Sequence, residues 1–546
     1  MLPFFGGYPD QFWSNAHYID ASAANYQFST SPSSAEQYSH ARGVQAVAVT
    51  AAAPVGQAAT VGHTVPPGYP WIDVEVGGGM AAAYNHRVHM YAIDMPSLHT
   101  CSIGAGVNML GYYMYHGGNN PHSLVYGKGS PLRDAPNTTL QESSFMPAGA
   151  QNPMPSESYD FFAPLGEFGQ PRPHYHSMRR LHLLVRDAEW GATVVESLRS
   201  DDTTRPADPV RWAIRSAGAN SASWLFVNNH ERAANLSTST GVRWLFECAR
   251  ISGATGKCDS LSVPSAASPP ISVVSDVWFV WPVNAPLFPG APSSASRVAY
   301  ATMQLLTRAS GAAGVTVVVF AQTEGVDPEL ALALGAGDSL ALHSAANVTV
   351  EGELTVLRGL TLGHAPCATV VRADGTRAQL VALPFGEADT VWVERVGSVD
   401  RILVSADAAL LLGEGNGSGF SLNVRTAFTL SDSGAAKSVA LSIFPAPSAI
   451  VLATTGAKLL PSADGVFQKF IVPVASPALV APSVRLTSPA APPRVITKPH
   501  GKAQEPTLED WVRYFSRSYR ARAACVRWAT SNIGPRVLAR SLSLAR

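Results

Sequence analysis

Two apolar segments in the first third of the chain predict buried strands that end at glycine. The first, at residues 71–77, reads Trp-Ile-Asp-Val-Glu-Val-Gly, and the second, at 108–117, reads Asn-Met-Leu-Gly-Tyr-Tyr-Met-Tyr-His-Gly. Their apolar runs are nearly continuous, and about thirty residues, enough for a helix, separate them. This pattern favours parallel strands of a β/α unit over an exposed antiparallel sheet.

A helix is predicted next, from His174 to Arg186, because apolar residues recur there at helical spacing. After the segment 203–209, which contains two prolines, the pattern changes to short strands between turn signals. These strands are expected at 223–227, 315–321, 368–373, 378–385, 390–396 and 439–444. The hairpin Val371–Arg377 has the strongest turn signal, an Asp-Gly pair. We therefore expect one or two β-sandwich-like domains within 210–480.

The end of the chain differs again. A linker rich in Pro, Ala and Ser at 475–493 precedes an amphipathic helix marked by Leu508, Trp511, Val512 and Phe515. Residues 494–546 hold 11 Lys and Arg against 3 Asp and Glu. This charge fits either a membrane-surface or nucleic-acid arm or a solvated helix, and without a recognition motif we prefer the solvated helix.

Composition narrows the possible classes of protein. Charged residues make up 14% of the chain, against about 25% in typical soluble domains, and 39 Lys and Arg balance 39 Asp and Glu. We therefore expect no nucleic-acid partner. Two uncharged stretches, 43–62 and 438–457, approach bilayer-spanning length but contain prolines, so we expect no transmembrane span. The first residues lack the basic region and long apolar run of a signal peptide, so no export signal is visible.

Cysteines and histidines give little support for metal chemistry. The five cysteines form no Cys-x-x-Cys pair, and Cys248 and Cys258 either close a short loop or stay unpaired. Of three histidines in or beside the predicted helix, two point to different faces, so we expect no metal site; they are His174, His176 and His182. The run Gly77–Gly79 lacks the Gly-Lys-Ser/Thr of a phosphate loop and predicts a tight turn or close packing beneath a sugar. Four glycosylation sequons begin at Asn137, Asn235, Asn347 and Asn416.

Four segments carry a more specific pattern: Leu2–Asp10, Val74–Met80 with Tyr84 and Arg87, Gly111–Pro121 and Ser158–Gln170. In this order they resemble the second part of the catalytic barrel of glycoside hydrolase family 35, the β-galactosidase family. A weaker resemblance to the family's accessory β-domains continues through Phe226–His230 and Tyr300–Gln304 and thins beyond about residue 400.

The resemblance implies a fold class that combines α/β and all-β parts. We expect the last strands of a (β/α)8 TIM barrel, followed by β-sandwich domains. The expected divisions are 1–187 for the barrel portion, 188–330 and 331–480 for two β-rich domains, and 481–546 for the linker and basic tail. The implied activity is removal of terminal β-linked galactose from a β-galactoside or glycan, with retention of configuration and without metal or organic cofactor. The implied location is secreted, lysosomal or vacuolar.

A retaining glycosidase needs two carboxyl groups about 5–5.5 Å apart, one as nucleophile and one as acid and base. Glu75, at the end of a predicted strand, falls at the family's nucleophile position. By the same resemblance, Tyr113, Tyr159 and Asn120 would contact the sugar, since a phenol can stack on a pyranose or donate to a carboxylate.

Departures from the family pattern leave three hypotheses open. Asn119 stands where the family usually has Thr, and Phe161 replaces a tyrosine. The acid/base motif, Asn-Glu-Asn/Glu-Tyr-Gly, does not occur in this chain. The sequence is therefore expected to be the C-terminal portion of a longer β-galactosidase. The alternatives are an inactive remnant that binds galactosides, and a hydrolase that uses Glu142 or Glu167 as its acid.

Overall fold

The computed structural model describes residues 2–7, 71–80, 89–119, 158–188 and, with short gaps, 196–474. These residues belong to one compact unit, Met1–Ser476, whereas the second unit, Pro477–Arg546, lies outside the described residues. The expected linker and amphipathic tail helix therefore lie outside them too. Within the described residues the fold is largely all-β, with several sheets and few helices. None of the described helices is long and apolar enough to cross a membrane.

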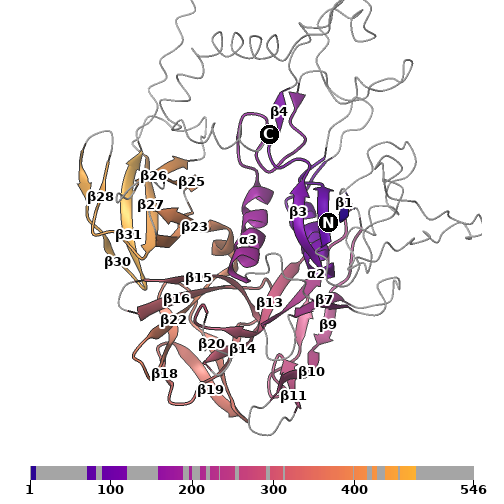
Figure 1. The fold of residues 1–546 in the computed structure, drawn as a ribbon, viewed down its shortest axis with the longest axis vertical. Coiled ribbons are helices and arrows are strands. Elements are labelled where there is room, and N and C mark those ends of the chain that lie inside the picture. The colour runs from indigo at the N-terminus through magenta and orange to yellow at the C-terminus, as the bar shows by residue number, and fades with distance from the viewer. Residues whose placement is uncertain are drawn as a thin grey trace, which may run out of the picture. The chain divides into compact units, whose positions relative to one another are not determined.

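A three-stranded parallel sheet begins the fold (Figure 1). Its order is β1 (Leu2–Gly7), β2 (Trp71–Val76), β3 (Val107–Tyr112). Helix α2 (Asp94–Ala105) connects β2 to β3, and helix α3 (Pro173–Ala188) follows the short strands β4 (Gly118–Asn119) and β5 (Ser158–Tyr159). The predictions of parallel strands and of a helix near 174–186 are confirmed, but β3 ends at Tyr112 instead of at Gly117, and most of its residues are half-buried.

The β-region that follows contains one large sheet and one smaller one. The eight-stranded sheet has the order β19 (Ala345–Glu351), β20 (Leu354–Leu360), β17 (Glu329–Ala333), β14 (Arg297–Ala301), β13 (Trp278–Pro286), β8 (Ser223–Asn228), β7 (Arg211–Ser216), β6 (Glu196–Arg199). The five-stranded sheet has the order β15 (Met303–Ser310), β16 (Val315–Gln322), β22 (Arg377–Leu383), β21 (Pro366–Val371), β18 (Ser339–Leu342). Both sheets contribute to one apolar core, as sheets packed face to face do.

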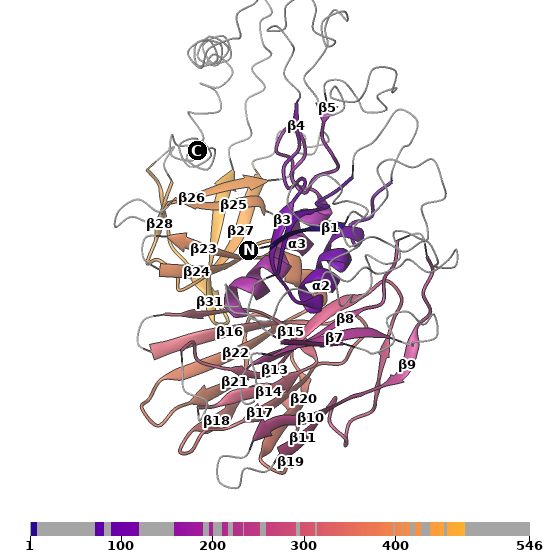
Figure 2. The same cartoon turned by 45° about the vertical axis from the view of Figure 1, so that its right-hand side comes forward.

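Strand β16 shows why its sequence is apolar without a break. Val318 and Phe320 join the core shared with the eight-stranded sheet, while Val317 and Val319 join a second core with α3 and a third sheet. Because both faces are covered, the usual alternation of apolar and polar residues disappears. Figure 2 shows β16 beside β22, with which it pairs in parallel.

A third, five-stranded sheet has the order β23 (Val391–Val396), β24 (Val399–Val404), β27 (Lys437–Phe444), β31 (Phe467–Val474), β30 (Ser462–Asp464). A short 3-10 helix, η5 (Phe385–Thr390), precedes it. Four small ribbons complete the described strands: β25 (Ala408–Glu414) with β26 (Ser421–Thr426), β28 (Ile450–Val451) with β29 (Lys458–Leu459), β10 (Trp244–Ile251) with β11 (Cys258–Val263), and β9 (Ser239–Val242) with β12 (Ile271–Val273).

The strands predicted from alternating patterns are present, with ends that differ by a few residues. The Asp-Gly hairpin is confirmed: Val371 pairs with Arg377, and Gly375 takes a φ of 84°, which glycine adopts without strain. The domain divisions stay predictions. The eight-stranded sheet contains strands from both sides of residue 330, so its strands do not separate at that residue.

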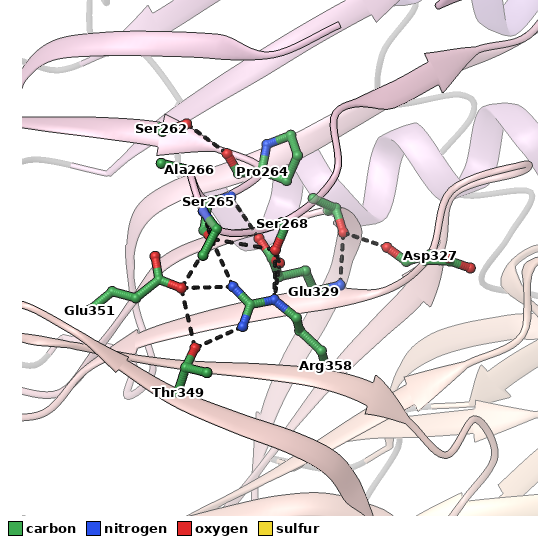
Figure 3. A network of polar contacts seen from close by, with 12 residues as sticks. Ser262, Pro264, Ser265, Ala266, Ser268, Asp327, Glu329, Thr349, Glu351 and Arg358 are labelled. Carbon is green, nitrogen blue, oxygen red and sulfur yellow. Dashed lines mark hydrogen bonds and ion pairs between the residues drawn. The ribbon is translucent and has the colours of Figure 1, made fainter. Parts of the chain in front are cut away.

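A polar network fixes a turn around Ser265 to the eight-stranded sheet (Figure 3). Arg358 donates from Nε to Glu329 Oε2 and from Nη2 to Glu351 Oε1, each at 2.7 Å. Glu329 Oε1 also accepts from the Ser265 backbone N–H, at 2.8 Å, and from the Tyr300 hydroxyl, at 2.5 Å. The Glu329 side chain is only 5% exposed, so its carboxylate depends on these partners for stabilisation.

Replacing Arg358 with Met should therefore lower the free energy of unfolding by about 3 kcal/mol, since Glu329 would keep its buried charge without a cation. Urea denaturation measures this loss. Arg372→Met is the control: its ion pair with Asp374 is open to solvent, which screens it, so its loss should change stability much less. Equal losses in the two variants would show that the network does not stabilise the fold beyond an ordinary surface pair.

Candidate functional site

The carboxyl ends of the parallel strands β2 and β3 meet at one edge of their sheet. Glu75 is the next-to-last residue of β2 and is half-buried. Between Asp73 and Val76 the pairing of β2 is irregular: it shifts by one residue against β3, and it shifts in opposite directions on either side of Glu75 against β1. Register shifts of this kind change the direction of side chains. Glu75, the residue that the resemblance selects as nucleophile, lies within this irregular part of the strand.

Two of the other predicted site residues lie together near this edge. Tyr113 directly follows β3, and its backbone N–H donates to the Val76 carbonyl at 2.9 Å. Its hydroxyl lies 2.5 Å from the hydroxyl of Tyr159, and both side chains are half-buried. Asn120, the remaining predicted contact, lies outside the described residues.

Phe161 occupies the centre of this aromatic group. It is 3% exposed, and its ring lies edge-on to Tyr113, with centroids 5.3 Å apart, and 5.6 Å from Tyr159. The tyrosine that the resemblance to glycoside hydrolase family 35 would lead us to expect here would place a hydroxyl in this packed position. Here the phenyl ring instead packs against both phenol rings.

The glycine run after β2 packs against the protein's own backbone. A Cβ at Gly78 would lie 2.2 Å from the Met114 carbonyl oxygen, and a Cβ at Gly79 would lie 2.3 Å from that of Phe161. Such distances are too short for any side chain, so these positions require glycine. The close packing expected from the sequence is present, and its partners are the segments that carry Tyr113 and Tyr159.

The loop after Tyr159 is held by a chain of polar contacts. Asp160 pairs with Arg172 at 2.5 Å and also accepts from the Glu167 backbone N–H at 2.7 Å. The Glu167 carboxylate accepts from Asn119 Nδ2 at 2.7 Å and from Ser158 Oγ at 2.6 Å. Of the two alternative acids considered above, Glu167 thus accepts hydrogen bonds from two neutral side chains. The other, Glu142, lies outside the described residues.

Helix α2 holds the glycine turn through a buried histidine. His99 is completely buried, and its Nε2 donates to the Gly77 carbonyl at 2.8 Å. Burial lowers the pKa of His99 to about 3, so the ring is neutral and acts as a fixed hydrogen-bond donor. The sequence offers no local signal for this role.

Charged residues fix both ends of α2 to the eight-stranded sheet. At its start, His230 lies between two carboxylates, with Nε2 2.9 Å from Asp94 and Nδ1 2.8 Å from Asp276. Arg232 adds a weaker contact to Asp94 at 3.7 Å. At its end, the fully buried Arg215 donates to the carbonyls of Ile103 and Val107, at 2.9 and 2.8 Å. A helix whose last carbonyls lack intrahelical partners is stabilised by such a donor.

The three histidines considered as metal ligands have different partners. Nε2 of His174 lies 3.0 Å from the Phe162 carbonyl, the His176 ring lies edge-on to Trp392, and Nε2 of His182 lies 2.8 Å from the Tyr112 hydroxyl. Burial lowers the pKa of each histidine to about 4. Across the described ranges, no cluster of three or more His, Cys, Asp or Glu side chains is placed to hold a metal ion.

Comparisons with known proteins add no assignment. No protein-family model matches this chain, and no curated protein is significantly similar to it. The functional argument therefore depends on the residues at this edge.

Replacing Gly79 with Ala should lower the free energy of unfolding by about 3 kcal/mol, because the new methyl group would overlap the Phe161 and Phe162 carbonyls. Thermal or urea denaturation measures the loss. Gly118→Ala is the matched control, since a Cβ there meets no atom within 4 Å. A Gly79→Ala protein as stable as the control would contradict the close packing.

Stability should also depend on pH through His230. Burial disfavours its charged form, but hydrogen bonds to Asp94 and Asp276 outweigh burial and raise the pKa of His230 above its ordinary 6.5. The stabilisation is therefore complete below about 6.5 and is lost as pH rises through the raised folded-state pKa. His230→Gln should cost about 2 kcal/mol at pH 5.5, with a smaller cost at pH 9. Urea denaturation at several pH values measures this cost. The control is His343→Gln, because the His343 imidazole is exposed and is hydrogen-bonded to the neutral Thr369 hydroxyl. A cost of His230→Gln that does not change with pH would contradict the charged bridge.

Proposed function

We propose that residues 1–187 form the last strands of a (β/α)8 barrel and carry part of a retaining β-galactosidase site. Support comes from three adjacent parallel strands in chain order, with α2 between β2 and β3. In barrels of this class, catalytic residues lie at the carboxyl ends of the strands. Glu75 and Tyr113 occupy such ends.

One observation carries the proposal: a half-buried carboxylate at the end of β2, on a strand whose next residue is hydrogen-bonded to the backbone of one of a pair of phenols. The Tyr113 backbone is bonded to Val76, the residue after Glu75, and the Tyr113 hydroxyl meets that of Tyr159 at 2.5 Å. Phenols near a carboxylate can donate hydrogen bonds to it and favour its ionised form. They also offer aromatic faces for the C–H face of a pyranose.

In the proposed reaction, Glu75 attacks the anomeric carbon of a terminal β-galactose and forms a covalent galactosyl ester. The bond to the leaving oxygen breaks, and that oxygen takes a proton from a second carboxylic acid. Water, deprotonated by the same group, then releases galactose with its original configuration. The motif that supplies this acid in the family is absent from these 546 residues, so the proposal requires the acid from another segment or chain.

That absence favours a second candidate, which is galactoside binding without hydrolysis. The aromatic group and Glu75 would then form a recognition surface only. The two candidates differ in whether Glu75 forms a covalent bond to the sugar.

A fluorinated galactoside with a dinitrophenolate leaving group separates them. The leaving group departs without protonation, so the nucleophile can be trapped even where no acid is present. We expect intact-mass analysis to show one added fluorogalactosyl group and peptide mapping to place it on Glu75.

Glu75→Gln should abolish this labelling, and Glu167→Gln should retain it, since the Glu167 carboxylate is hydrogen-bonded to Asn119 and Ser158. An unlabelled protein that binds galactose in calorimetry would support the binding candidate. A protein that neither reacts nor binds would overturn both.

A further inference from the structure

Phe168 is the most exposed of the large apolar side chains in the described residues, at 86%. It lies in the loop that follows Tyr159, between Gly166 and Gln170. An exposed phenyl ring forgoes burial that would contribute about 2 kcal/mol, so its outward position needs a reason. Single exposed apolar residues are common on protein surfaces, but this one lies on a loop whose backbone is held by several hydrogen bonds.

Backbone and side-chain contacts fix the loop on both sides of Phe168. The Phe168 N–H donates to Gln170 Oε1 at 2.9 Å, and the Gly169 N–H donates to the Gly166 carbonyl at 2.8 Å. The Asp160–Arg172 ion pair, at 2.5 Å, closes the base of the loop. The ring is therefore presented outward on a well-defined backbone, which lowers the entropic cost of binding.

The same loop begins within the candidate site. Phe161 packs against Tyr113 and Tyr159, and two successive residues, Phe161 and Phe162, take left-handed φ values of 57° and 47°. Bulky residues rarely adopt this conformation, and it recurs at functional sites. Glu167, adjacent to Phe168, accepts a hydrogen bond from Ser158, the neighbour of Tyr159.

We propose that Phe168 is a platform for the sugar unit to which the terminal galactose is linked. This inference rests on the proposed function and extends it to the substrate class. Tyr113 and Tyr159 are half-buried at the strand edge, whereas Phe168 extends into solvent from the next loop. Phe168 is therefore placed to contact the part of a ligand that extends outward, and the apolar face of a second pyranose would stack on its ring. The substrate is then a galactose-terminated oligosaccharide, with a contact beyond galactose.

Calorimetry with two ligands tests this inference without any need for turnover. The ligands are free galactose and a sulfur-linked galactosyl-β-1,4-glucose, which glycosidases do not cleave. Phe168→Ala should weaken binding of the disaccharide about tenfold, the loss expected for one stacking contact of about 1.4 kcal/mol, and should leave galactose affinity unchanged. Phe168→Trp should restore the affinity.

Leu245→Ala, at a 66% exposed residue of β10, is the control and should change neither affinity. If the Phe168→Ala protein binds the disaccharide as tightly as the unaltered protein does, the platform is overturned and the proposed function still stands. Equal weakening of both ligands would place Phe168 against galactose and overturn the assignment to the second sugar. Unaltered protein that binds neither ligand would overturn the proposed function and the platform together.

Discussion

The backbone at Gly78 and Gly79 touches two other segments so closely that no side chain fits between them. One of these segments follows β3 and carries Tyr113, and the other directly follows Tyr159, the last residue of β5. The glycines after β2, the strand that carries Glu75, thus pack against the backbone next to both tyrosines. Without this contact, the relative positions of the segments that carry Glu75, Tyr113 and Tyr159 would vary.

The candidate site also depends on residues far from it. His99 fixes the glycine turn from α2, and α2 is itself held to the eight-stranded sheet by His230 at one end and Arg215 at the other. The apolar faces of α2 and α3 pack against β7, β8 and β13. The sheet region thus sets the position of the helix and, through it, of the strand edge that carries Glu75.

The sequence predicts those features that are encoded by neighbouring residues. The continuous apolar run of β2, its glycine ending and the Asp-Gly hairpin are visible in neighbouring residues. The resemblance selected Tyr113 and Tyr159, and the structure places their hydroxyls together. The contact between Asp94 and His230 spans 136 residues and leaves no pattern in either segment. The exposure of Phe168 could not be predicted from sequence either, because it depends on how the folded loop packs against Asp160.

The parallel pairing of β16 with β22 affects how this chain reaches its structure. Residues 323–376 lie between these strands, and within them β17, β19 and β20 belong to the opposite sheet. The chain therefore passes from one sheet to the other between β16 and β22, and this long-range pairing has a high entropic cost before its contacts form. The five-stranded sheet cannot be complete until the chain extends to Leu383, whereas all strands of the eight-stranded sheet end by Leu360.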